Sequence, residues 1–206
     1  MIAFDAERDA PALDRLAAAR ELELGEARAP LARFAALVSR WGQRTDLVAG
    51  PSVEALVEVL FLDAFALSPL VPEGAELIDV GAGAGAPTIP LALLRPDLRA
   101  ELREPRRRRV AFMRTAVGAL GLAERVRVRE GRLADGEEGS FEVALSRATF
   151  APEEWLRRGS ALARRVILLL AREAPPERPG WAPIGEVRYA VPSSGAPRRA
   201  VAYEAR

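Results

Sequence analysis

The spacing of apolar and polar positions differs between the first part of the chain and the rest. Over the first seventy residues, apolar side chains recur at spacings of three and four, the period of an amphipathic helix. The pattern predicts one helix around 13–17, a second across 31–41 and a third across 52–67. Ser52 is suited to cap the third helix, and Pro69 should end it. We therefore expect residues 1–72 to form a helical extension.

From residue 76 onward, short apolar runs are separated by helical stretches, a pattern typical of βαβ units and a parallel sheet. The expected strands lie at 77–80, 100–103, 126–129, 143–145 and 166–170, and the expected helices at 88–94, 106–120 and 152–163. The runs 185–191 and 199–203 flank a Pro-Ser-Ser-Gly turn and predict an antiparallel hairpin. A Pro-rich loop is expected at 174–183. Residues 73–206 should thus form an α/β core that is compact with the extension.

Composition narrows the possible chemistry. All thirty basic residues of the 206 are arginine, and Lys, His, Cys and Asn are each absent. Their absence excludes a Cys or His zinc site, a nucleophile activated by His, a lysine Schiff base and a phosphate loop of the Walker A type. We expect no metal site. Any reaction must use carboxylates, arginines, hydroxyls, backbone amides or a cofactor.

The remaining bulk features point to a cytoplasmic protein. Without Cys the chain has no disulfide framework, and its first residues mix charges of both signs where a signal peptide needs an apolar run. The apolar stretch 55–72 is interrupted by Glu58, Asp63 and Pro69, so we expect no membrane insertion. Thirty basic and 29 acidic residues nearly cancel, and a nucleic-acid partner would need a local basic patch.

The strongest motif is the run Leu-Ile-Asp-Val-Gly-Ala-Gly-Ala-Gly-Ala-Pro at 77–87, in which a strand ending in Asp79 meets three alternating glycines. Glycines let a ligand approach the backbone closely. The third glycine of the dinucleotide fingerprint is replaced by Ala86, which favours a nucleoside cofactor over a pyrophosphate. Glu104 lies roughly 20 residues further on, where an acid can bind ribose hydroxyls. The alternative is a tight turn without a ligand.

Three segments of the chain resemble the RsmG (GidB) family. They are the stretch 79–113, which begins with the glycine run, Leu-Ser-Arg-Ala at 145–148 and Leu-Phe-Leu-Asp-Ala at 60–64. That family comprises S-adenosylmethionine-dependent methyltransferases acting on guanine N7 of 16S ribosomal RNA. The resemblance implies a Rossmann-like class I fold, with a mostly parallel seven-stranded sheet whose last strand is antiparallel. It also implies S-adenosylmethionine as cofactor, and 16S RNA or the 30S subunit as partner of a monomer.

The resemblance further implies a set of site residues. The cofactor-binding set comprises Asp79, Gly81, Gly83, Gly85, Ala86, Glu104, Leu133, Ala134 and Arg147. The glycines and Ala86 would face the methionine part, Glu104 the ribose, and Leu133 and Ala134 the adenine. Arg147 would lie at the reaction centre, unless it is an ordinary surface arginine. Asp63 is the second catalytic candidate, and it is either a carboxylate directed to the cofactor or a buried acid paired with an arginine that holds the N-terminal helices on the core.

A basic stretch supplies candidates for RNA binding. Residues 95–132 hold twelve arginines and five acids, a local excess of seven positive charges. Arg106, Arg107, Arg108 and Arg109 could contact phosphates, although a solvated helix start is the alternative.

One departure from the family leaves the substrate open. Val59 and Leu60 replace a frequent Arg-His pair. Two alternatives therefore remain: a divergent methyltransferase with another RNA or a small-molecule substrate, or a non-catalytic ribosome-binding or RNA-binding module.

Overall fold

The computed structural model describes residues 3–42, 47–48 and 51–206. Its N-terminal part is helical, as expected: α1 Ala10–Ala18, a 3₁₀ turn at Gly25–Ala27, α2 Arg28–Gly42, α3 Val53–Leu67 and a second 3₁₀ turn at Ser68–Leu70. Ser52 caps α3, because its Oγ accepts a hydrogen bond from the backbone N–H of Ala55 at 3.1 Å. Within the described ranges, no helix is long and apolar enough to cross a bilayer.

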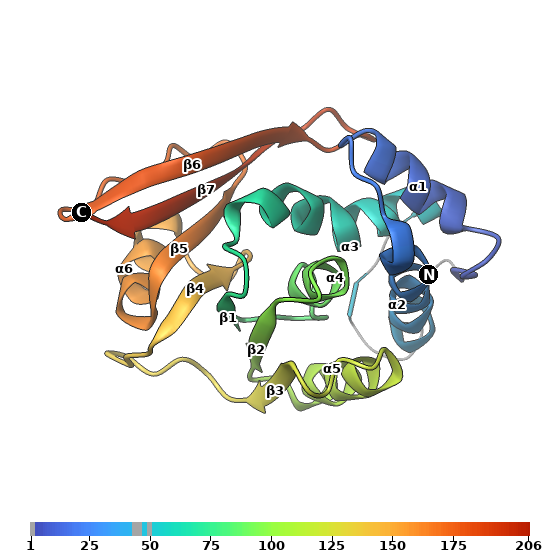
Figure 1. The fold of residues 1–206 in the computed structure, drawn as a ribbon, viewed down its shortest axis with the longest axis horizontal. Helices are drawn as coiled ribbons and strands as arrows, with labels where there is room; N and C mark the ends of the chain where they lie inside the picture. The colour runs from blue at the N-terminus through green and yellow to red at the C-terminus, as the bar shows by residue number, and fades with distance from the viewer. Residues whose placement is uncertain (1–2, 43–46, 49–50) are drawn as a thin grey trace.

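In the part of the chain that the structure describes, seven strands form one sheet, and three helices connect its parallel strands (Figure 1). The strands are β1 Glu76–Val80, β2 Arg99–Glu104, β3 Val126–Glu130, β4 Phe141–Ser146, β5 Ala163–Leu170, β6 Trp181–Ala190 and β7 Pro197–Ala205. The helices are α4 Thr88–Leu94, α5 Arg107–Ala119 and α6 Pro152–Leu162. The strand order is β3-β2-β1-β4-β5-β7-β6, and β7 pairs antiparallel with both neighbours. The predicted sheet with an antiparallel last strand is confirmed.

The C-terminal hairpin is longer than the sequence predicts. β6 begins at Trp181, so the last residues of the expected loop at 174–183 belong to a strand, and that part of the prediction was wrong. Trp181 pairs with Ala205 of β7 and packs against the buried cluster around α6. The β6–β7 register shifts between Pro183 and Gly185, where Pro183 has no N–H to donate. β6 and β3 are the two edges of the sheet.

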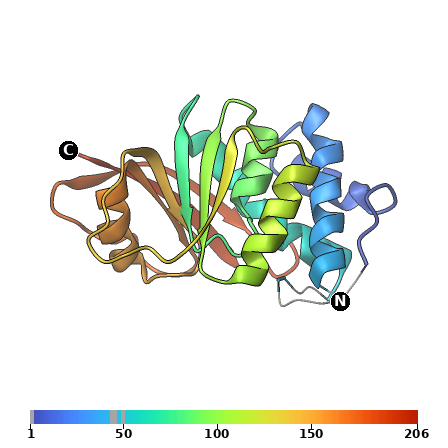
Figure 2. The same ribbon diagram turned by 90° about the horizontal axis from the view of Figure 1, so that it is seen from below.

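Helices cover both faces of the sheet, with α6 on one side and α2 and α5 on the other (Figure 2). Successive side chains of a strand point to opposite faces, so neighbouring residues of β1 enter different cores. Leu77 lies in the cluster shared with the N-terminal helices, and Ile78 lies in the cluster around α6. The central strands are therefore buried on both faces, which explains their continuous apolar sequence.

The helical extension shares a core with the sheet. Phe34 of α2 lies 6.4 Å from Phe112 of α5 and 6.3 Å from Phe61 of α3, measured between ring centroids, and none of the three is exposed. One apolar cluster thus contains side chains from both sides of residue 72. The division into 1–72 and 73–206 remains an interpretation of the sequence.

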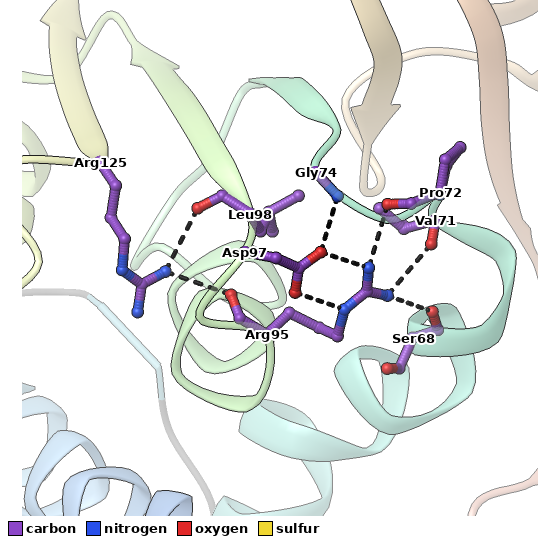
Figure 3. A network of polar contacts seen from close by, with 8 residues as sticks. All are labelled: Ser68, Val71, Pro72, Gly74, Arg95, Asp97, Leu98 and Arg125. Carbon is purple, nitrogen blue, oxygen red and sulfur yellow. Dashed lines mark hydrogen bonds and ion pairs between the residues drawn. The ribbon is translucent and has the colours of Figure 1, made fainter.

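A polar network fastens the junction between these two parts (Figure 3). The Arg95 guanidinium, at the end of α4, donates to the carbonyls of Ser68, Val71 and Pro72 at 3.0–3.1 Å and pairs with Asp97 at 2.7 Å. Asp97 also accepts from the backbone N–H of Gly74 at 2.8 Å. The Arg95 side chain holds the pKa of Asp97 well below the usual range. These contacts set the entry of β1 and so the position of the glycine loop that follows.

Candidate active site

Two cavities adjoin at the edge where the parallel strands β1 to β5 end, the edge at which open α/β sheets bind ligands. The glycine-loop cavity, of about 600 Å³, is lined by residues that follow β1, β2, β3 and β4, including Gly81, Leu133, Ala134 and Phe150. The Arg147 cavity, of about 430 Å³, lies between α3, the ends of β4 and β5, and the C-terminal hairpin. The two have sizes suited to small-molecule groups.

The loop after β1 turns sharply at Gly81. The backbone N–H groups of Gly81 and Ala82 donate to the carbonyl of Arg103 at 2.8 and 3.1 Å, which binds the loop to the end of β2. Gly81 has φ +78°, and a Cβ there would collide with Oγ1 of Thr149. This glycine is required by the fold itself, whatever it contacts in a complex.

Gly83 differs from Gly81 in its surroundings. Its φ is also positive, at +60°, but the nearest side-chain atom to a Cβ added at this position would be Nη1 of Arg109 at 3.7 Å. A side chain at this position would therefore not collide with a neighbouring atom, and the space beside Gly83 is open to a ligand. Gly85 is explained by packing, because its Cβ would collide with Cδ1 of Ile89, and Ala86 is buried.

Glu104 stands at the end of β2 beside this loop. Its Oε2 accepts the backbone N–H of Gly83 and its Oε1 accepts that of Arg106, each at 3.0 Å. The residue is only 3% exposed. The Glu104 carboxylate therefore fixes the conformation of the glycine loop. Its remaining lone pairs can accept hydrogen bonds from the hydroxyl groups of a ligand. Sequence reasoning placed Glu104 at this edge but missed its contact with Gly83.

Asp79 is fully buried behind the loop. Its Oδ2 accepts a hydrogen bond from the Thr88 hydroxyl at 2.6 Å, and within the described ranges its Oδ1 has no partner. Burial raises the pKa of Asp79 to about 7, against the opposing effects of the Thr88 hydrogen bond and the Arg147 charge. An orphaned carboxylate oxygen at this place suits a ligand that carries a hydrogen-bond donor or positive charge.

Asp79 should make the stability of the ligand-free protein depend on pH. Between pH 4 and 7 the folded protein keeps the Asp79 proton while the unfolded chain has lost it. The free energy of unfolding should therefore fall as pH rises through this window, by up to about 4 kcal/mol. The chain has no His, so few other side chains titrate between pH 5 and 7. Urea unfolding at several pH values measures the slope.

An Asp79→Asn variant is the control for this slope. Asparagine stays neutral at every pH in the window. The free energy of unfolding of the variant should therefore change much less between pH 5 and 7 than that of the unchanged protein. Equal slopes in the two proteins would show that the Asp79 carboxyl is already ionised in the folded state.

Arg147 and Asp63 meet in the second cavity. Nη1 of Arg147 donates to Oδ2 of Asp63 at 3.1 Å and to the carbonyl of Val59 at 2.9 Å. The Tyr189 hydroxyl, from β6, donates to Oδ1 of Asp63 at 2.8 Å, and burial together with the Asp63 charge raises the pKa of Tyr189. Asp63 is thus the acid paired with an arginine, and both side chains line the Arg147 cavity. Arg147, expected from the resemblance in the cofactor-binding set, is not among the residues that line the glycine-loop cavity.

Two further features of this cavity are not apparent from the sequence. Ala148 has φ +55°, a conformation that L-residues rarely adopt, so the chain turns abruptly after Arg147. Glu58 of α3 accepts the N–H and the hydroxyl of Ser193 at 2.8 and 2.6 Å, which docks the hairpin turn on α3. Tyr189 and Ser193 are more than 120 residues from their partners, and only the fold brings them together.

The basic stretch is less positive than its composition indicates. Several of its arginines are engaged with acids or carbonyl groups: Arg95, Arg103, Arg107, Arg125 and Arg129. Of the four RNA-binding candidates, Arg106 and Arg108 are exposed at the start of α5, Arg107 pairs with Glu130 at 3.0 Å, and Arg109 reaches the glycine loop. Among the described residues, no cluster of acidic side chains has the form of a metal site.

Comparison with known proteins identifies related sequences. Residues 28–171 match the GidB family model, described as rRNA small subunit methyltransferase G. Ribosomal RNA small subunit methyltransferase G of Frankia alni is 44% identical over 144 residues, which are 68% of this chain and 54% of that protein. The Stenotrophomonas maltophilia K279a protein of the same name is 37% identical over 169 residues, 80% of this chain and 79% of that protein.

The chain spans about half the length of several of these relatives, from 46% to 54%. Among solved structures, Sp1610 of Streptococcus pneumoniae in complex with S-adenosyl-L-methionine has a TM-score of 0.53 and 19% sequence identity, covering 71% of this chain and 73% of that chain. At this level of identity the similarity shows a shared fold.

Proposed function

This chain belongs to the GidB family, that of rRNA small subunit methyltransferase G, and from that premise we propose that it is an enzyme transferring a methyl group from S-adenosylmethionine to guanine N7 of 16S ribosomal RNA. The observation that carries this proposal is the pair of adjoining cavities at the carboxyl edge of the sheet, one formed around a glycine loop and one containing Arg147. The partner would be 16S RNA or the 30S subunit, bound by a monomer.

The glycine-loop cavity fits a nucleoside cofactor. Leu133 and Ala134 line it as an apolar wall. Gly83 and Glu104 lie outside this lining, on the glycine loop and at the adjoining end of β2, where Gly83 leaves open space and Glu104 offers a carboxylate to ribose hydroxyls. Asp79 lies buried behind the loop with its Oδ1 unpaired among the described residues, which suits a polar group of this cofactor. When bound, the cofactor supplies an electrophilic sulfonium methyl group.

The chain's own residues have to place the base and exclude water, because guanine N7 already carries the lone pair that reacts and no general base is required. The Nε and Nη2 groups of Arg147 have no partner within the described residues. We propose that they donate to guanine O6, which leaves N7 unblocked. Asp63 would fix the guanidinium in this orientation, since its Oδ2 holds Nη1 at 3.1 Å and leaves the other two nitrogen atoms to the base.

The replaced Arg-His pair motivates a second candidate, a divergent methyltransferase with another RNA or a small-molecule substrate. Val59 lines the Arg147 cavity and is 40% exposed, whereas Leu60 is fully buried in the core. Only the first replacement therefore alters the surface offered to a substrate. A non-catalytic RNA-binding module is the third reading, and it predicts weak binding of S-adenosylhomocysteine.

One experiment separates the three candidates. The protein is incubated with methyl-labelled S-adenosylmethionine and 30S subunits from cells that lack this modification, and the 16S RNA is digested and analysed. The proposed function predicts label in 7-methylguanosine. Label in another product would favour the divergent enzyme, and absence of both transfer and cofactor binding would favour the binding module.

The proposed RNA contact at the start of α5 makes a separate prediction. Arg108 is exposed at this helix start, so Arg108→Glu should weaken RNA binding and reduce the salt slope, log K against log salt, by about 1. Cofactor affinity should stay unchanged. A third cavity lies at the opposite edge, where β4 and β5 begin, and Arg164 is an exposed arginine that lines it. Arg164→Glu is therefore the matched control. Equal effects of the two reversals would place the RNA footprint elsewhere.

A further inference from the structure

Phe150 lies where the two cavities meet. It lines both of them, and no other residue of the described ranges is common to the two linings. The abrupt turn at Ala148 accounts for this position, because Arg147 before the turn lines one cavity and Thr149 after it lines the other. Phe150 is therefore a partition between the two cavities.

The ring of Phe150 is fixed by two side chains of α6. It stacks on the indole of Trp155 at an interplanar angle of 12°, with ring centroids 5.7 Å apart. The guanidinium carbon of Arg158 lies 5.2 Å from the centroid of the same ring. Trp155 is only 3% exposed, and its Nε1 donates to the carbonyl of Ile167 at 3.0 Å. The indole is thus a firm support, and Arg158 is the more adjustable contact.

Arg158 connects the ring to the loop that follows β3. Its Nη2 donates to Oδ1 of Asp135 and its Nε donates to Oε1 of Glu154, each at 2.5 Å. Asp135 lies on the wall of the glycine-loop cavity, next to Leu133 and Ala134. The side chain of Arg158 is 18% exposed although that of Asp135 is 88% exposed. A displacement of this loop therefore reaches Phe150 through one side chain.

We propose that Phe150 is a positioning residue that couples the two cavities. Occupation of the glycine-loop cavity steadies the loop at Asp135, Asp135 holds Arg158, and Arg158 keeps the ring of Phe150 in place as a wall for the base in the Arg147 cavity. This inference rests on the proposed function.

Two consequences follow for an enzyme of this kind. Methyl transfer requires an in-line arrangement of nucleophile, methyl group and sulfur, so a displaced wall lowers kcat more than it lowers cofactor affinity. Coupling of two binding sites is also reciprocal. The cofactor product should therefore strengthen the binding of RNA, and RNA should strengthen the binding of the cofactor product.

The test compares the unchanged protein with Phe150→Leu, Phe150→Tyr and Arg158→Ala. The affinity for 30S subunits is measured with and without S-adenosylhomocysteine, together with kcat and the affinity for S-adenosylhomocysteine alone. In the unchanged protein and in Phe150→Tyr, S-adenosylhomocysteine should strengthen 30S binding about fivefold or more. In Phe150→Leu and Arg158→Ala this factor should approach one, kcat should fall about tenfold or more, and affinity for S-adenosylhomocysteine should change less than about threefold.

Two matched controls exclude a general loss of structure. Arg157 lies on the same helix and pairs with the same Glu154, at 2.8 Å, but within the described ranges the cation over the Phe150 ring is that of Arg158. Phe141 is an aromatic residue of β4 that lines the cavity at the opposite edge. Arg157→Ala and Phe141→Leu should keep the coupling factor of the unchanged protein.

The outcomes separate this inference from the function on which it rests. If the unchanged protein neither binds S-adenosylhomocysteine nor transfers a methyl group, the proposed function is wrong. If it does both but S-adenosylhomocysteine leaves its 30S affinity unaltered, only the coupling is wrong. Retention of coupling and kcat in Phe150→Leu, or an Arg157→Ala defect as large as that of Arg158→Ala, would also overturn it.

Discussion

Replacement of Gly83 by valine should lower the affinity for S-adenosylhomocysteine by at least about a hundredfold, equivalent to about 3 kcal/mol, while the protein remains folded. The reason lies in the space around this residue. A Cβ at Gly83 would meet no protein atom closer than 3.7 Å, so the added side chain occupies room that the proposed cofactor needs. Calorimetric titration measures the affinity, and circular dichroism verifies the fold.

A second glycine separates the steric effect from backbone strain. Gly121 has φ +69° and open space around its missing Cβ, but it lies in the turn after α5, away from both cavities. Gly121→Val should therefore lose about 1–2 kcal/mol of stability, as Gly83→Val does, and keep its cofactor affinity. A Gly83→Val protein that binds S-adenosylhomocysteine normally would remove the glycine loop from the binding site. Gly81 is unsuitable for this test, because its replacement collides with Thr149.

Replacement of Arg147 by alanine should reduce methyl transfer to 16S RNA by about a hundredfold or more. The variant loses the N–H groups proposed to hold the base and leaves Asp63 with only Tyr189 as a partner among the described residues. Affinity for S-adenosylhomocysteine should change less than about threefold, because Arg147 lines the other cavity. Single-turnover rates and cofactor titration measure the two effects.

Arg165 is a matched control for Arg147. It too binds a carboxylate, Glu204, and a backbone carbonyl, that of Leu70, and its side chain is 20% exposed against 27% for Arg147. It lies beside the cavity at the opposite edge. Arg165→Ala should destabilise the fold. The rate of methyl transfer should fall only in proportion to the fraction of molecules that are unfolded. If Arg147→Ala turns over RNA at the rate of Arg165→Ala, Arg147 has only a structural role.

The order of elements was accessible from sequence because it depends on local periodicity. α4 begins and ends where the apolar pattern places it, and the parallel strands contain the expected apolar runs. The start of β6 was not accessible, because Trp181 becomes a strand residue only through its pairing with Ala205. Neither the spacing of residues nor the composition of a segment predicts how two distant strands pair.

The site shows the same limit. The motif at 77–87 and the Arg147 segment both lie at strand ends where cavities are found, since a strand end fixes where its following loop lies. The division of this region into two cavities was not predicted. Long-range partners were hidden: Tyr189 reaches Asp63 across 126 positions, and Glu137, one of two acids that bind Arg103, lies 34 positions away from it. Counting arginines at 95–132 therefore overstated the free positive charge, because pairing depends on side-chain geometry.

The irregular edges of the sheet affect how this protein behaves at high concentration. β6 lies at one border, where Pro183 cannot donate and the register shift interrupts the ladder, and the outward side chains of β3 at the other border include Arg127 and Arg129. A strand from a second molecule would meet an interrupted ladder at β6 and a charged border at β3, and both oppose pairing. Edge-to-edge growth into fibres is therefore disfavoured, even though the long hairpin leaves Ile184 exposed to solvent.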